Sequence, residues 1–97
     1  MNAFEAFVKS MEATSPPAGI SPLLKALWQD GKGDWDGAHV IAQDINGMEG
    51  SWVHAYLHRK EGDLWNAGYW YREAHREMPE LTLEEEWEML VKHFLEK

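Results

Sequence analysis

Two histidines, His54 and His58, stand four residues apart in the segment SWVHAYLHRK. Residues at i and i+4 share one face of a helix, so both imidazoles could reach a single metal ion. A complete site needs a further ligand, which His39 or His75 could supply from a neighbouring helix. Residue 55 is Ala, where a zinc-peptidase HExxH motif would have Glu. The pair indicates either a small metal- or ligand-binding protein, with an enzyme among the options, or simply two solvated histidines.

The helix that carries these histidines also has an aromatic side. Successive residues of a helix are about 100° apart, which places His54 and His58 together on one side. The opposite side carries a mostly apolar set with one arginine among it: Trp52, Val53, Ala55, Tyr56, Leu57 and Arg59. The histidines are therefore expected to face outward, and the aromatic side to face inward.

Trp52, Tyr56 and Arg59 lie at i, i+4 and i+7, on one stripe of this helix. Such a stripe is typical of a peptide-binding surface, because aromatic rings supply contact area and arginine offers a fork of N–H donors to carboxylates. The alternative is that Trp52 and Tyr56 are core residues and that Arg59 stacks on Trp52. We favour the core for Trp52, whereas Tyr56 and Arg59 stay open between the two interpretations.

A second stripe follows on the next helix and consists of Trp65, Tyr69, Arg72 and Arg76. We expect the C-terminal helix to cover its two aromatic residues, and its two arginines to pair with nearby acids such as Glu73. An interface with a second subunit is the alternative. The candidate partner-binding residues are thus Trp52, Tyr56, Arg59, Arg72 and Arg76.

No catalytic motif or cofactor fingerprint is present. Three of the four serines are explained by turns or helix caps, and no G-x-S-x-G elbow occurs. The glycine-rich segment GKGDWDG is neither a P-loop nor a dinucleotide fingerprint, because no strand precedes it. The absence of cysteine excludes disulfides and thiolate zinc sites. We predict no catalytic residue and no cofactor, and an enzymatic role is the less favoured one.

Length and charge limit the remaining classes. The chain has 97 residues, enough for a single helical domain over residues 1–97, and 44% of them are hydrophobic. The net charge of −8 disfavours nucleic acid and anionic membranes as partners. The N-terminus lacks the pattern of a signal peptide, and no apolar run approaches the ~20 residues that span a bilayer. A cytoplasmic protein is expected.

The hydrophobic periodicity predicts an all-α fold of about six helices and no sheet. Helices are expected over about 2–13, 21–31, 34–45, 51–61, 63–78 and 82–97. Ser21, Asp34 and Ser51 are predicted N-caps, and Thr82 with Glu85 forms a predicted capping box.

Two segments repeat with an offset of 29 residues, each with the pattern Ala, then Gly-Asp, then Ala. Ala26, Gly33-Asp34 and Ala38 align with Ala55, Gly62-Asp63 and Ala67. Gly permits the left-handed conformation that ends one helix, Asp caps the next, and small Ala residues let the paired helices approach closely. Each unit is thus a helical hairpin, and stacking two hairpins buries the apolar face of both.

The second unit, residues 51–79, resembles a tetratricopeptide repeat in the spacing of Ala55, Ala67, Tyr71, Ala74 and Pro79. The first unit, residues 21–50, matches weakly. The resemblance implies two stacked hairpins with N- and C-terminal capping helices, and by analogy a module that binds proteins or peptides. The expected partner is a protein, a peptide or a second copy of the chain; the alternative function is the metal or ligand site at His54 and His58.

Overall fold

The computed structural model describes residues 2–96, and within that range the fold is all-α, as predicted. Six helices follow one another, and no strand occurs among the described residues. None of these helices is long and apolar enough to cross a membrane. Their bounds are α1 Ala3–Ser10, α2 Pro22–Gly31, α3 Trp35–Gln43, α4 Met48–Lys60, α5 Leu64–Glu73 and α6 Leu83–Leu95.

Most helix ends lie where the capping residues predict them. The side chains of Ser21 and Asp34 accept hydrogen bonds from the backbone of the first turns of α2 and α3. Thr82 and Glu85 form the reciprocal capping box of α6, with N–O distances of 2.9 and 3.1 Å. These caps satisfy backbone N–H groups that have no partner within the helix.

Three predicted helix ends are wrong. Helix α1 ends at Ser10 rather than at residue 13. Ser51 is not an N-cap, because α4 begins at Met48, directly after Gly47 with its φ of 96°. Gly50 makes this earlier start possible, since a Cβ there would lie 2.1 Å from the carbonyl oxygen of Ile45. Helix α5 ends at Glu73 rather than near Met78, because His75 adopts a left-handed conformation with φ 58° that stops the helix.

The four central helices form two hairpins, α2 with α3 and α4 with α5, and α3 packs on α4 to join them. Both hairpins turn in the same way at the offset of 29 residues. Gly33 and Gly62 have φ values of 88° and 87°, and Asp34 and Asp63 cap the following helices. The repeated alanines Ala26, Ala38, Ala55 and Ala67 are all fully buried where the helices meet.

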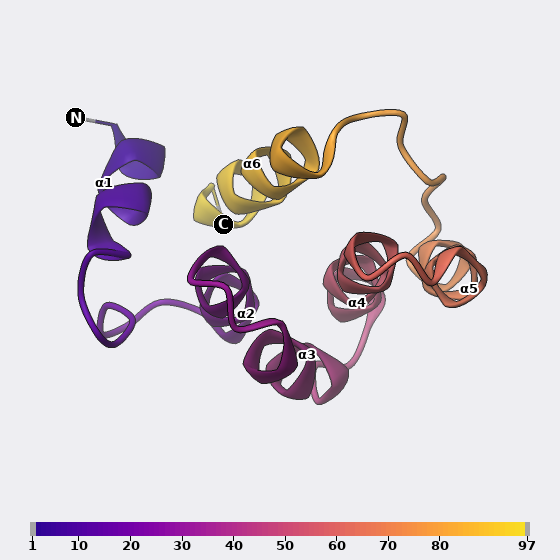
Figure 1. The fold of residues 1–97 in the computed structure, drawn as a ribbon, viewed down its shortest axis with the longest axis horizontal. Coiled ribbons are helices and arrows are strands. Elements are labelled where there is room, and N and C mark those ends of the chain that lie inside the picture. Colours follow the sequence, from indigo (N-terminus) through magenta and orange to yellow (C-terminus); the bar gives the residue numbers. More distant parts are fainter. Residues whose placement is uncertain (1, 97) are drawn as a thin grey trace.

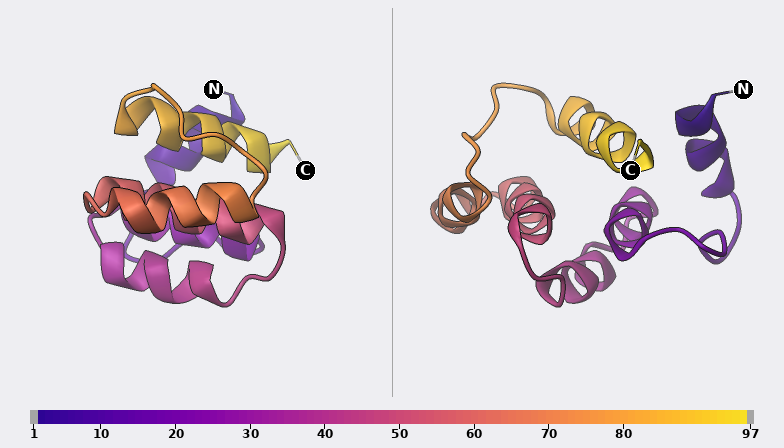
Figure 2. Two further views of the ribbon diagram at one scale, coloured as in Figure 1. Left: turned by 90° about the vertical axis from the view of Figure 1, so that its right-hand side faces the viewer. Right: turned by 180° about the vertical axis from the view of Figure 1, so that it is seen from behind.

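Figure 1 shows the arc formed by α2, α3, α4 and α5, with α6 lying across its open side. Helix α6 packs on α1, α2 and α4 and makes no close backbone approach to α5, the helix that precedes it in the chain. The two further views agree that α1 and α6 lie together on the same side of the central helices (Figure 2). We call the surface of α2 and α4 that α6 covers the α2/α4 face.

Because α6 lies on the α2/α4 face, the prediction that it covers Trp65 and Tyr69 is wrong. These two side chains of α5 are 78% and 42% exposed. Trp87 of α6 instead contacts the rings of Phe4 and Phe7 on α1, with centroid distances of 6.0 Å. Its indole nitrogen donates to the carbonyl oxygen of Leu27 on α2 at 2.9 Å, which anchors α6 to the first hairpin.

Two glycine substitutions should change stability in opposite directions. Gly62→Ala should lower the free energy of unfolding by about 1–2 kcal/mol, because an L-residue at φ 87° is strained although nothing lies within 4 Å of its Cβ. Gly68→Ala, inside α5, should raise it by about 0.5–1 kcal/mol, because the nearest atom is 3.5 Å away and alanine favours the helix. Urea denaturation of both variants measures the sign of each change in the free energy of unfolding. A decrease for Gly68→Ala would contradict this description of α5.

Candidate functional site

A buried carboxylate holds α6 on the α2/α4 face. Glu86 of α6 is fully buried, at 0% exposure. One of its oxygens accepts from the Arg59 guanidinium at 2.8 Å, and the other accepts from the Tyr71 hydroxyl at 2.5 Å. Arg59 also donates to the backbone carbonyl oxygen of Leu81, just before α6. Charge and hydrogen bonds thus satisfy a group whose burial would otherwise be very costly.

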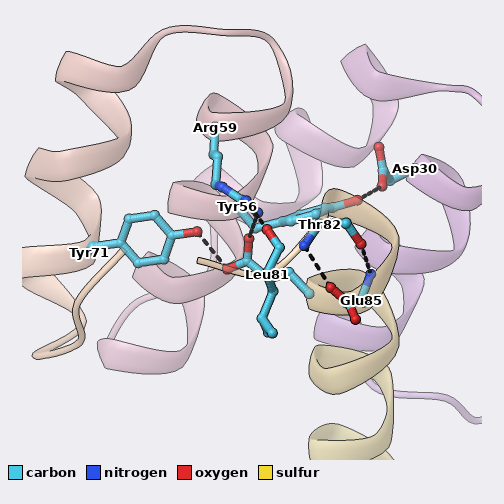
Figure 3. Close-up of polar contacts among 8 residues, drawn as sticks. Asp30, Tyr56, Arg59, Tyr71, Leu81, Thr82 and Glu85 are labelled. Carbon is cyan, nitrogen blue, oxygen red and sulfur yellow. Dashed lines mark hydrogen bonds and ion pairs between the residues drawn. The ribbon is translucent and has the colours of Figure 1, made fainter. Parts of the chain in front are cut away.

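A second buried carboxylate, Asp30 of α2, lies on the same side and is 2% exposed. It accepts from the Tyr56 hydroxyl at 2.7 Å and from the Lys60 ammonium at 2.8 Å, both on α4. Burial and the Asp30 carboxylate raise the pKa of Tyr56 far above its ordinary value, so the phenol remains a donor at any physiological pH. Figure 3 shows Tyr56 reaching Asp30 beside Arg59 and Leu81.

The three residues of the first predicted stripe have different environments. Trp52 is buried in the core, as we favoured. The guanidinium of Arg76 stacks on its ring, 3.4 Å from the ring centroid. Of the two interpretations left open for Arg59, the stacking on Trp52 is therefore not the one observed. Arg59 reaches Glu86 instead, and Tyr56 is buried against Asp30. Tyr56 and Arg59 therefore line the α2/α4 face, and α6 of the same chain occupies it.

The second stripe remains on the surface of α5. Arg72 is exposed beside Trp65 and Tyr69, and the expected ion pair with Glu73 is absent. Arg76 lies beyond the end of α5 and makes its contact with Trp52. The structure thus separates these two arginines, and it brings neither of them to Arg59.

The prediction that His54 and His58 face solvent is wrong. His54 is only 7% exposed and His58 is mostly covered. The physical reason is that α2, α3, α5 and α6 all pack on α4, so this helix has no freely solvated side over residues 52–57. Trp70 of α5 stacks on His54 at a centroid distance of 4.1 Å and covers it from outside.

His39 of α3 lies against the two histidines of α4. Its Nε2 is 2.9 Å from Nε2 of His54, and the rings of His54 and His58 are stacked 4.8 Å apart. One ring nitrogen of each histidine lies within 4.8 Å of the other two. Burial, with the neighbouring histidines, lowers the pKa of His54 to about 4, and burial also lowers the pKa of His39. The imidazoles of His39 and His54 are therefore neutral at pH 7.

Sequence reasoning missed Glu86 and Asp30, although the sequence carries a signal for both. Glu86 belongs to the acidic first turn of α6, yet it also lies between Leu83 and Leu90 on the apolar stripe of this helix. Asp30 likewise follows Leu27 by three residues on the buried stripe of α2. An acid at an apolar position indicates a buried partner, and the arginine, lysine and tyrosines of residues 51–79 were available as donors.

The buried ion pair allows a matched test. Glu86→Gln should lower the free energy of unfolding by about 3 kcal/mol, because it leaves the Arg59 guanidinium largely buried without its counter-charge. Glu84→Gln, on an exposed position of the same helix turn, should change it by less than about 0.5 kcal/mol. Chemical denaturation of the two variants measures both values; equal effects would mean that the Glu86 charge contributes nothing.

The histidine cluster predicts the sign of a pH effect on stability. The pKa of His54 is about 4 in the fold and 6.5 ordinarily, so the unfolded chain binds protons that the fold excludes. Stability should therefore be complete above pH 6.5 and fall as the pH is lowered towards 4, by up to about 1.4 kcal/mol per pH unit for one histidine. The lowered pKa of His39 adds to this loss of stability, although the carboxylates of Glu61 and Asp36 act in the opposite direction by raising that pKa.

Denaturation curves at several pH values check this slope. His54→Phe should flatten it, because phenylalanine can stack on Trp70 and has no proton to bind. His93→Phe, at a half-exposed position on α6, should leave the slope unchanged. An unaltered slope in the His54 variant would mean that other groups cause the loss.

Comparisons with known proteins assign no family to this chain. No protein-family model matches its sequence. No curated protein and no solved structure matches it at a significant level. Its function must therefore be inferred from its own side chains and their arrangement.

Proposed function

We propose that the protein is a tetratricopeptide-like interaction module whose α2/α4 face binds an amphipathic helix with a central carboxylate. One observation carries the proposal: α6 is such a helix, and it is docked there through Glu86, Arg59 and Tyr71. The bound helix is α6 of the same chain in the closed state. In an assembled state it is α6 of a second copy, in a cytoplasmic setting and without nucleic acid.

The repeat architecture supports the first part of the proposal. The two hairpins share their turn conformation, capping aspartates and buried alanines at the offset of 29 residues. Stacked hairpins present the first helix of each unit on one side, and here these helices are α2 and α4. A helix-binding face formed by α2 and α4 is what such an arrangement offers to a partner.

The chemistry of the face supports the choice of ligand. Arg59 and the hydroxyl of Tyr71 are donors that need a carboxylate, and they flank the apolar residues that α6 covers. Leu90, Val91 and Phe94 of α6 supply the matching apolar side and are almost completely buried. A helix with an acid one turn before such an apolar stripe satisfies both requirements.

The connection to α6 supports exchange between copies. Residues 75–82 link α5 to α6 without regular helix. The backbone of α6 approaches α1, α2 and α4 closely but not α5, which reaches α6 through the hydroxyl of Tyr71. Such a segment, extended, spans up to about 26 Å. Exchange of α6 between two copies would re-form every contact of the closed chain, so it costs little in contact energy.

Charge reversal across the ion pair tests exchange directly. Arg59→Glu alone sets two carboxylates against each other, and Glu86→Arg alone sets two guanidinium groups together, so each variant should bind its own α6 poorly. Mixed, the two variants can exchange α6, which pairs Glu at 59 with Arg at 86 and restores the native pair in the other half. Native mass spectrometry should show a one-to-one heterodimer that neither variant forms alone.

The control is the single chain that carries both reversals, Arg59→Glu with Glu86→Arg. It should recover most of the thermal stability as a monomer, which would show that the reversed pair fits. If this control folds and the mixture still behaves as the sum of its two variants, α6 does not dock between copies and the proposal of self-assembly fails.

A further inference from the structure

We propose that His39, His54 and His58 form a binding site for a divalent transition-metal ion between α3 and α4. One nitrogen of each ring lies within 4.8 Å of the other two, although the three residues come from two helices and are 15 and 4 positions apart. The site is on the opposite side of α4 from Arg59 and Glu86 and is independent of α6. It therefore goes beyond the helix-binding function.

The spacing of the nitrogens suits one ion. Two imidazoles on a tetrahedral zinc ion, each at about 2.0–2.1 Å, have their nitrogens about 3.3 Å apart. Nε2 of His39 and Nε2 of His54 are 2.9 Å apart, so an opening of a few tenths of an ångström admits the ion. The ring of His58 stacks on that of His54 at a centroid distance of 4.8 Å and meets that of His39 edge to face at 5.3 Å, which places a third donor beside this pair.

A carboxylate orients the third imidazole. Nδ1 of His58 is 2.6 Å from Oε1 of Glu61, one turn further along. A carboxylate at this distance accepts a hydrogen bond from Nδ1–H, which leaves the Nε2 lone pair of His58 for a ligand. Histidine ligands commonly donate their other N–H to a carboxylate in this way, and the contact makes the coordinating nitrogen more basic.

Two tryptophans hold the other rings. Trp35 stacks on His39 with a centroid distance of 4.9 Å and an interplanar angle of 13°. Trp70 stacks on His54 at 4.1 Å and 19°. Trp35 is itself fixed, because its indole nitrogen donates to the carbonyl oxygen of Leu57 at 2.8 Å. The cluster is therefore pre-organised, and binding an ion requires little reordering of side chains.

The ligand set specifies the class of ion. Neutral imidazoles without thiolates suit zinc, nickel and copper, whereas calcium and magnesium require oxygen ligands. The burial that keeps His39 and His54 neutral also leaves their lone pairs available at pH 7. Asp63 lies near His58 and Glu61 but accepts from the backbone and the side chain of Asn66, so it is committed to capping α5.

Isothermal titration calorimetry tests the site: the full, metal-free chain is titrated with Zn²⁺ at pH 7.5. We expect one ion per chain, and a Co²⁺ complex with the strong visible absorption of a tetrahedral ion. His39→Gln should weaken Zn²⁺ binding about 100-fold, because it removes a ligand at a half-buried position. Glu61→Gln, on an exposed residue, should weaken it about tenfold by loosening His58.

Two controls keep the result decisive. His75→Gln and His93→Gln remove histidines outside the cluster and should leave Zn²⁺ affinity unchanged. Circular dichroism shows whether each variant is folded. If a histidine variant does not fold, the Glu61 variant still tests the site, because Glu61 is exposed and its replacement leaves the packing intact. The proposal is overturned if Zn²⁺ does not bind saturably, or if binding survives His39→Gln and Glu61→Gln undiminished. In that case the cluster is a polar packing contact between α3 and α4.

Discussion

The pairing of Glu86 with Arg59 and Tyr71 is the constraint on which the rest of the structure depends. A carboxylate at 0% exposure is tolerable only where donors meet both of its oxygens, and here α4 and α5 supply one each. That requirement fixes the rotation of α6 and its register on the α2/α4 face. It also fixes which side of α4 is turned towards α6, and therefore which side is left for α3.

Helix α4 consequently serves two sites at once. Arg59, Tyr56 and Lys60 reach the acids of α6 and α2, whereas His54 and His58 meet His39 of α3. Because α2, α3, α5 and α6 all pack on α4, the polar side chains in the middle of this helix are covered and need partners inside the protein. The buried carboxylates of α6 and α2 are the partners on one side of α4, and the histidine cluster with its tryptophans provides them on the side that faces α3.

The sequence predicted the local features well because they depend on neighbouring residues. Gly62 with Asp63, and Thr82 with Glu85, specify their turn and cap from adjacent backbone chemistry. The predictions from the sequence were wrong where they depended on which helices pack against each other. The prediction that His54 faces outward assumed that α4 has only one buried side. The prediction that α6 covers Trp65 assumed that α6 packs against α5, the helix that precedes it in the chain. Asp30 and Glu86 at apolar positions were the available indication of a polar interior, and only the assembled helices show their donors.

Native-state hydrogen exchange of the amides of α6 would show whether α6 leaves the α2/α4 face as a unit. If the α2/α4 face binds α6 as a separable helix, the amides of α6 should exchange together at a lower opening free energy than those of α4 and α5. The Schellman turn at Gly62 and the hairpin it closes should stay protected during that opening. If the amides of α6 exchange only through global unfolding, at the same free energy as those of α4, then α6 is a fixed part of the core and not a separable ligand of the α2/α4 face.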